Sequence, residues 1–280
     1  NMRKKILFII TKSEMGGAQR FLYKLVTHLD AQKYDISIAS GDSPAGGELF
    51  EKLTENGINT KKIRNFSNIF GIKNFLAFLE ILNLIRKIKP DILYLLSSEA
   101  GFTGSIAGSF YRFFSRKKLK IIYRIGGWAF KEPHNIIIKK LYLWAEKTSA
   151  PFKDIIIVNS EFDRQLAIKN HIVKENKIIT IYNGVSINEL IFLPREKAIH
   201  FLYQKISPVS PPTVGIIANL YKNKGLEYVI IAAKKLKEDG KNYHFIIIGD
   251  GPERFSLEKT IKNNELENTV CLIGSIPGAY

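Results

Sequence analysis

The sequence predicts an α/β protein built on parallel β-sheets, and two observations lead to that prediction. Short apolar runs have the composition of parallel strands that are buried on both faces; they lie at 5–10, 91–96, 213–218 and 243–248. Between the last two runs, apolar residues recur at three- and four-residue spacing, at Leu226, Val229, Ile230, Ala233 and Leu236. A strand, a helix with one buried face and a second strand make a β-α-β unit.

Length and a proline-rich stretch predict two domains. The chain has 280 residues and 45% hydrophobic content, enough for a substantial core. Segment 207–212 contains three prolines, which lack N–H donors and restrict their neighbours, so it is typical of an extended linker. We therefore expect an N-terminal domain at 2–206 and a C-terminal domain at 207–280.

Within the N-terminal domain, the same patterns predict the remaining elements in order. We expect strands at 34–40, 120–125, 154–159 and 177–182, and helices at 48–56, 74–88 and 136–150. Another helix follows the first strand, with Phe21, Leu22, Leu25, Val26 and Leu29 on one face. Ser160 is a suitable N-cap for a further helix. Residues 97–101 are expected to form a loop at the carboxyl end of a strand.

In the C-terminal domain, the β-α-β unit is followed by a predicted helix at 257–263 and a strand at 270–273. Glycine-bearing loops, 219–225 and 249–254, follow its first two strands. Lys224 precedes a glycine that opens a helix, an arrangement suited to phosphate. Gly249 and Gly251 carry no Cβ, so another backbone can approach them closely. Ordinary turn glycines and a solvated lysine are the alternative interpretation.

The single cysteine, Cys271, excludes an internal disulfide and is typical of a reducing compartment. The apolar run at 6–10 is too short for the core of a signal peptide. The most apolar long stretch, 66–88, is interrupted by charged residues, so we expect no membrane-spanning helix. These observations predict a cytoplasmic protein.

The net charge of +16 is concentrated in the N-terminal domain. Residues 1–206 contain 33 basic and 18 acidic residues, whereas residues 207–280 contain nine and eight. The densest segment, 109–120, interleaves aromatic residues with Arg112, Arg116, Lys117, Lys118 and Lys120. Such a segment suits an anionic membrane surface or a nucleic-acid backbone, and a solvated helix end is the alternative. No nucleic-acid-binding motif occurs, so we predict the membrane surface and no nucleic acid.

Several motifs together resemble a known family. They are Gly16-Gly-Ala-Gln-Arg20, the stretches 91–101, 155–161 and 181–185, the loops 219–225 and 249–254, and Val270-Cys-Leu-Ile-Gly274. In this order and spacing they resemble the family 4 (GT4) retaining glycosyltransferases of the GT-B fold. The resemblance implies two Rossmann-like parallel-sheet domains, of which the second is incomplete in this chain.

The resemblance also implies a function. Such enzymes transfer a hexose from a nucleotide-diphospho-sugar, with retention, to a lipid-linked or saccharide acceptor during synthesis of cell-surface polysaccharide or glycolipid. They need no metal or other cofactor, and they work peripherally on the inner face of the cell membrane. The substrate-binding positions carried over are Gly16, Gly17, Asn219, Lys224, Gly249, Gly251, Arg254, Gly274 and Ile276. Lys224 is the residue expected to stabilise the departing diphosphate.

The sequence departs from the family pattern at functional positions. Gly126 stands where many relatives have a histidine, and glycine cannot perform the role of that histidine. The candidates to take over the role are Glu132 and His134. Relatives also carry an arginine near the lysine, where this chain has Asn219 and Tyr221. Glu99 stands where the family often has lysine, so we assign it no catalytic role. The family's Glu-x7-Glu donor motif is absent from the sequence. We therefore expect the 280-residue chain to be inactive.

Two other functions remain open from the residues. The chain could be a non-catalytic module that binds a nucleotide-sugar or a partner protein on a degenerate GT-B scaffold. A dinucleotide-dependent oxidoreductase also contains β-α-β units, but the loop 11–17 lacks the Gly-x-Gly-x-x-Gly pattern. Binding of UDP-sugar but not NAD separates the oxidoreductase from the other two.

Overall fold

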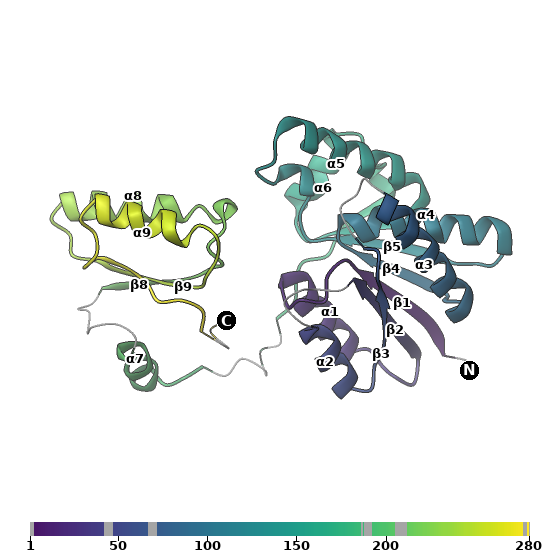
Figure 1. Ribbon diagram of the computed structural model, residues 1–280, viewed down its shortest axis with the longest axis horizontal. Helices are drawn as coiled ribbons and strands as arrows, with labels where there is room; N and C mark the ends of the chain where they lie inside the picture. Colours follow the sequence, from purple (N-terminus) through teal and green to yellow (C-terminus); the bar gives the residue numbers. More distant parts are fainter. Residues whose placement is uncertain are drawn as a thin grey trace. The chain divides into compact units, whose positions relative to one another are not determined.

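A computed structural model describes residues 3–41, 47–66, 72–185, 187, 192–204, 212–276 and 279. The chain divides into two compact units, Asn1–Val185 and Ser186–Tyr280, and each is described by itself (Figure 1). The division precedes the boundary predicted at 206/207, so helix α7 (Arg195–Tyr203) belongs to the second unit. Most of the proline-rich segment that prompted the prediction lies outside the described residues.

The first unit is built on a seven-stranded sheet in which all neighbouring strands are parallel. Its strand order is β3-β2-β1-β4-β5-β6-β7, so the direction of winding reverses between β1 and β4. Ligands of such sheets bind at the carboxyl ends of the strands, at the point of reversal. The strands are β1 (Lys4–Ile10), β2 (Tyr34–Gly41), β3 (Asn59–Ile63), β4 (Ile92–Leu96), β5 (Lys120–Ile125), β6 (Ile155–Val158) and β7 (Ile178–Thr180).

Helices cover both faces of this sheet. Alternate residues of β1 point into different cores: Leu7 and Ile9 into one, and Ile6, Phe8 and Ile10 into the other. Helices α1 (Gly17–Thr27) and α2 (Glu48–Glu55) close the second core. Helices α3 (Ile72–Ile88), α4 (Ser98–Ser115), α5 (Ile136–Ser149) and α6 (Glu161–Lys169) lie on the opposite side of the sheet (Figure 1). The predicted α/β class with parallel sheets is confirmed.

Helix α4 differs from the prediction of a loop at 97–101. Gly101, Gly104 and Gly108 lower its helix propensity, but all three lie against the sheet. A Cβ on Gly101 would lie 2.4 Å from the Tyr123 ring, and one on Gly104 would lie 2.5 Å from Leu95. The glycines therefore allow close helix–sheet packing, which outweighs their propensity.

A buried ion pair lies between α5 and the sheet. Lys153 Nζ donates to Glu146 Oε2 at 3.0 Å, and Tyr123 Oη donates to Glu146 Oε1 at 2.7 Å. The same ammonium lies 3.9 Å from the centre of the Tyr123 ring and donates to Ser149 Oγ. Burial lowers the pKa of Lys153 and raises that of Tyr123. These bonds compensate the charges for lost solvation.

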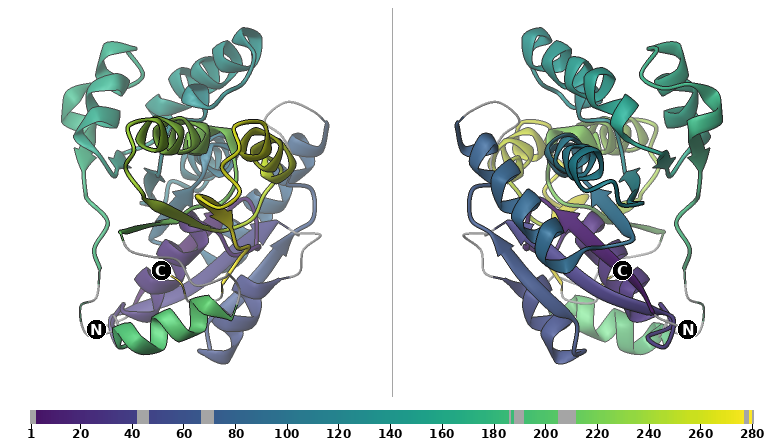
Figure 2. Two further views of the ribbon diagram at one scale, coloured as in Figure 1. Left: turned by 90° about the vertical axis from the view of Figure 1, so that its left-hand side faces the viewer. Right: turned by 90° about the vertical axis from the view of Figure 1, so that its right-hand side faces the viewer.

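The second unit is a three-stranded parallel sheet in the order β10-β9-β8. Its elements are β8 (Thr213–Ile217), α8 (Leu226–Glu238), β9 (His244–Ile248), α9 (Arg254–Asn263) and β10 (Val270–Leu272). Helices α8 and α9 lie side by side on one face of the sheet (Figures 1 and 2). Leu226, Ile230 and Ala233 are buried from α8, as the periodicity predicts.

In the part of the chain that the structure describes, no helix is both long and apolar enough to cross a membrane.

Candidate functional site

A cavity of about 480 Å³ opens at the carboxyl edge of the seven-stranded sheet. The loops that follow β1, β4, β5, β6 and β7 all contribute to it, as expected for a parallel sheet whose winding reverses. Its lining is Gly17, Ala18, Phe21, Leu96, Ser97, Ser98, Arg124, Ile125, Gly126, Gly127, Ala129, Glu132, Asn159 and Asn183.

The predicted glycine pair lies at this cavity. Gly16 is the N-cap of α1, and Gly17 is its first residue and part of the lining. No acidic side chain occupies the first turn of α1. Because the first N–H groups of a helix lack internal partners, this end of α1 carries a partial positive charge beside the cavity.

Ser97 adopts a strained backbone conformation at the end of β4. Its φ of 89° lies in a region that favours glycine, and its side chain accepts a hydrogen bond from Ala100 N as the N-cap of α4. The Thr11 hydroxyl hydrogen-bonds to the Ser97 hydroxyl and also donates to Glu99 Oε2 at 3.3 Å. These contacts join the loops after β1 and β4.

Arg124 is the principal buried charge of the cavity. It lies on β5 with 4% of its surface exposed, and its guanidinium carbon is 3.4 Å from the centre of the Phe21 ring. Its Nη2 donates to Asn183 Oδ1. Burial lowers the pKa of Arg124, an effect opposed by Tyr94. Burial also raises the pKa of Tyr94 to about 12, with Arg124 acting in the opposite direction.

The structure separates the residues considered as replacements for the family histidine. Gly126 and Glu132 line the cavity. His134 is outside the lining, is exposed, and stacks on Tyr142 with ring centres 5.6 Å apart. Of the two candidates, Glu132 is therefore the one whose position suits a role in the cavity.

In the second unit, three glycines bring together the loops after β8, β9 and β10. Gly249 has φ of 147°, and a Cβ there would lie 2.0 Å from Ala218 O. A Cβ on Gly251 would lie 2.7 Å from Leu220 O. Gly249 N donates to Gly274 O at 2.9 Å. The sequence predicted close backbone approach at Gly249 and Gly251, and the geometry requires it.

Hydrogen bonds fix these loops further. Leu220 N donates to Asp250 O, and Glu253 N donates to Leu220 O, both at 3.0 Å. Asn219 is exposed beside this contact, and Ile276, two residues beyond Gly274, is half-buried.

Lys224 and Arg254 differ in their surroundings. Lys224 is exposed in a 3₁₀ turn, Lys222–Lys224, directly before Gly225, which caps α8 with φ of 65°. Arg254 Nη2 donates to Leu272 O at 3.2 Å, and its Nε lies 2.9 Å from Glu258 Oε1. Arg254 thus ties α9 to β10, whereas the ammonium of Lys224 faces solvent beside a helix start.

Sequence reasoning did not select Arg124, Phe21, Ser97 or Asn183. One feature could have identified Arg124, because it interrupts the apolar strand 121–125 and arginine is rarely fully buried without a partner. Across the residues that the structure describes, no group of three His, Cys, Asp or Glu side chains is arranged to hold a metal ion.

Comparison with known proteins identifies the family. Residues 15–189 match the model of Glycosyltransferase Family 4, and residues 202–279 match that of Glycosyl transferases group 1. The first match alone covers more than half of the chain. The chain belongs to the GT4-type glycosyltransferases with the GT-B fold, which confirms the resemblance seen in the sequence.

Three individual proteins illustrate the similarity. The Escherichia coli UDP-Gal:α-D-GlcNAc-diphosphoundecaprenol α-1,3-galactosyltransferase is 26% identical over 96% of this chain and 68% of its own length. The E. coli O-antigen biosynthesis glycosyltransferase WbnH is 29% identical over 65% of this chain and 49% of its length. The structure of Anabaena Alr3699/HepE with UDP and glucose matches 98% of this chain and 70% of that one, with a TM-score of 0.75 and 22% identity. The chain thus spans about half to two thirds of these two curated relatives.

Proposed function

We propose that this chain is the part of a glycosyltransferase that binds a nucleotide-diphospho-sugar in the second unit and an acceptor in the first. The observation that carries the proposal is the loop cluster at the carboxyl ends of β8–β10. There, Gly249 and Gly251 permit backbone approach, and Lys224 stands exposed before the N-terminus of α8. An ammonium beside helix N–H groups suits a departing diphosphate.

The proposed reaction transfers a hexose with retention to a lipid-linked or saccharide acceptor in polysaccharide synthesis, without a metal ion. Support for the donor comes from the HepE structure, which contains UDP and glucose. Support for the acceptor comes from the names of the E. coli relatives, one acting on GlcNAc-diphosphoundecaprenol and one in O-antigen biosynthesis. Gly17 lines the cavity proposed for the acceptor, and Gly16 precedes it as the N-cap of α1.

A transfer assay tests this proposal. The product of the complete gene is incubated with UDP-hexoses and a polyprenyl-diphosphate-linked saccharide, and proton NMR identifies the new linkage. We expect release of UDP and an α-linked product from an α-linked donor. A β-linked product would contradict retention, and failure to use any nucleotide-sugar would contradict the glycosyltransferase itself.

One observation favours a second candidate, a non-catalytic nucleotide-sugar- or partner-binding module. Gly126 supplies no side chain to the cavity, and His134 lies outside the lining. A module of this kind would bind UDP-sugar and still give no product in the transfer assay. We expect the same of the 280-residue chain itself, because its sequence lacks the Glu-x7-Glu motif.

We also propose peripheral attachment of the first unit to the cytoplasmic face of an anionic membrane. Aromatic rings join α3 and α4 in one cluster, in which half-buried Phe78 links the exposed rings of Phe75, Phe110, Phe113 and Phe114. Exposed Arg116, Lys117 and Lys118 follow directly after α4. Rings can enter the lipid interface while the basic heads contact lipid phosphates.

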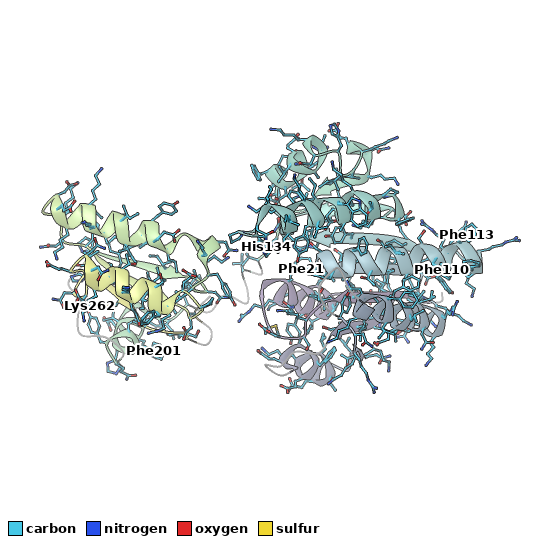
Figure 3. The ribbon with its side chains drawn as sticks, turned by 45° about the horizontal axis from the view of Figure 1, so that its top comes forward. Phe21, Phe110, Phe113, His134, Phe201 and Lys262 are labelled. Atoms are coloured by element: carbon cyan, nitrogen blue, oxygen red, sulfur yellow. The ribbon has the colours of Figure 1, made fainter. Side chains whose placement is uncertain are left out.

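The structure bears on the predicted membrane segment in two ways: it removes Arg112 from the free basic residues, and it shows where the segment lies. Arg112 Nη1 donates to both carboxylate oxygens of Asp154, at 3.0 and 3.1 Å, so it is committed to an internal ion pair. The segment also lies at the far end of α4, about 27 Å along the helix from Ser98 at the cavity. Figure 3 places Phe110 and Phe113 at the opposite end of the unit from Phe21 and His134.

A second apolar surface lies on α5, whose first residue follows the cavity residue Glu132 by four positions in the sequence. Ile136 and Ile137, in the first turn of α5, are 65% and 67% exposed, and Trp144 follows two turns later. Exposed Lys140 and Lys147 accompany them on the same helix. We propose that this face of α5 also contacts the bilayer, which would bring a lipid-linked acceptor near the cavity.

A further inference from the structure

Arg124 carries a buried positive charge whose hydrogen bond and ring contact are both with neutral side chains. These partners are Asn183 Oδ1 and the Phe21 ring. Glu132 lines the same cavity. Burying a guanidinium without an anion is costly, so such a residue is typical of a site whose counter-ion is a ligand.

Gly126 keeps this guanidinium accessible from the cavity. A Cβ at position 126 would lie 3.9 Å from Nη1 of Arg124, and no other heavy atom lies as near to it. A side chain at this position would therefore begin in van der Waals contact with the guanidinium. Asn159 Nδ2 donates to Gly126 O at 3.1 Å, which holds the loop in this open position.

The surroundings of Arg124 also favour an anion. Gly17 brings the N-terminus of the 11-residue helix α1 to the cavity, and that first turn has no acidic residue. Phe21, one turn further along α1, holds the guanidinium from the side. A planar guanidinium offers two parallel N–H donors, the geometry that matches phosphate oxygens.

We propose that the Arg124 cavity binds a phosphate group of the acceptor, the diphosphate that links a saccharide to its lipid. This inference rests on the proposed function and specifies the acceptor of the same reaction. The donor's diphosphate has its own candidate partners in the second unit, at Lys224 and the Gly249–Gly251 loop. Arg124 acts as an acceptor-binding residue, and Gly126 provides the space for the phosphate.

Titration calorimetry with farnesyl diphosphate, a soluble prenyl diphosphate, tests the inference on the whole chain saturated with UDP. We expect one site, and farnesol without its phosphates should bind far more weakly. Arg124→Gln should weaken farnesyl diphosphate binding about 10- to 100-fold, the effect of one charged hydrogen-bond pair. Arg86→Gln on α3, an exposed arginine away from the cavity, is the matched control and should change nothing.

Because Arg124 is buried, a second variant keeps the test independent of folding. Gly126→Leu changes an exposed residue and should cover the guanidinium, again weakening farnesyl diphosphate at least 10-fold. Unchanged affinity in both variants would overturn the inference, as would equal binding of farnesol.

The donor is the competing source of phosphate. If Arg124→Gln weakens UDP in the absence of farnesyl diphosphate by the same factor, the cavity binds the donor phosphate and the acceptor assignment is wrong. If the unaltered chain binds farnesyl diphosphate but not UDP, the donor proposal fails while the Arg124 inference is supported.

Discussion

The guanidinium carbon of Arg124 lies 3.4 Å from the centre of the Phe21 ring, so a strand residue and a helix residue form one wall of the cavity. The ring fixes the cation without neutralising it. A desolvated cation–π contact is worth up to about 2 kcal/mol, and Arg124 would lose this support if the ring were removed.

We predict that Phe21→Leu weakens farnesyl diphosphate binding by about three- to tenfold, because the guanidinium loses its fixed orientation. Phe162→Leu is the control, since the Phe162 ring lies 4.4 Å from Lys131 Nζ and is not part of the cavity lining. Calorimetry on both variants is the measurement. An equal loss in both would show a general destabilisation and contradict a role for Phe21 in the cavity.

We predict that Gly249→Ala destabilises the second unit by about 2 kcal/mol or more, because its Cβ would collide with Ala218 O at positive φ. Gly215→Ala in β8, where a Cβ meets nothing within 4 Å, is the control. Urea denaturation followed by circular dichroism measures the change. Both tryptophans, Trp128 and Trp144, belong to the first unit, so their fluorescence provides an internal reference. Equal stability of the two variants would contradict the close approach.

Alkaline pH should destabilise the first unit through Tyr94. Burial raises its folded pKa to about 12, whereas an unfolded tyrosine ionises near pH 10. Between these values the folded state binds the extra proton, so the free energy of unfolding falls as pH rises, by up to about 1.4 kcal/mol per pH unit. Below pH 10 the contribution is fully present.

Urea denaturation at pH 9 and pH 11, with Tyr94→Phe compared to the unaltered chain, measures this contribution. The phenylalanine variant should lose less stability between the two pH values. Tyr228→Phe alters an exposed tyrosine of the second unit and serves as the control. A Tyr94→Phe variant with the same pH dependence as the unaltered chain would refute the assignment.

Membrane attachment should depend on where the charge lies. Replacing Arg116, Lys117 and Lys118 by Glu should release the chain from anionic vesicles, since each basic residue near the surface contributes roughly 1 kcal/mol. Replacing Lys234, Lys235 and Lys241 of the second unit by Glu changes the net charge by the same amount. This control should release less of the chain from the vesicles. Vesicle sedimentation at low and high salt is the measurement. Equal binding to neutral and anionic vesicles would rule out an electrostatic contribution to membrane attachment.

The sequence predicted the strands of both units well where apolar runs were continuous, as in β1 and β9. It missed β3, an edge strand whose residues are mostly polar, and most of α4, whose glycines look like a loop. The contacts of Gly101 with Tyr123 and of Gly104 with Leu95 stabilise this helix against the sheet, and they form only when the helix packs on its neighbouring strands. Such packing is not readable from local propensity.

Part of the candidate site could also be predicted from the sequence, and part could not. Close approach at Gly249 and Gly251 followed from local chemistry, because neither glycine carries a Cβ. The Arg124 cavity depends on Phe21, Gly126 and Asn183, which meet only when the sheet brings the ends of their elements together. Sequence spacing alone could not assemble that set.

The most direct test of the account is calorimetric titration of the chain with UDP and, separately, with NAD. We predict that UDP binds at one site and that NAD does not bind. Lys224→Ala should weaken UDP by about 1 to 3 kcal/mol, whereas Lys222→Ala in the same turn should have little effect. Binding of NAD in place of UDP, or UDP affinity that does not change in Lys224→Ala, would contradict the nucleotide-sugar site at the carboxyl ends of β8–β10.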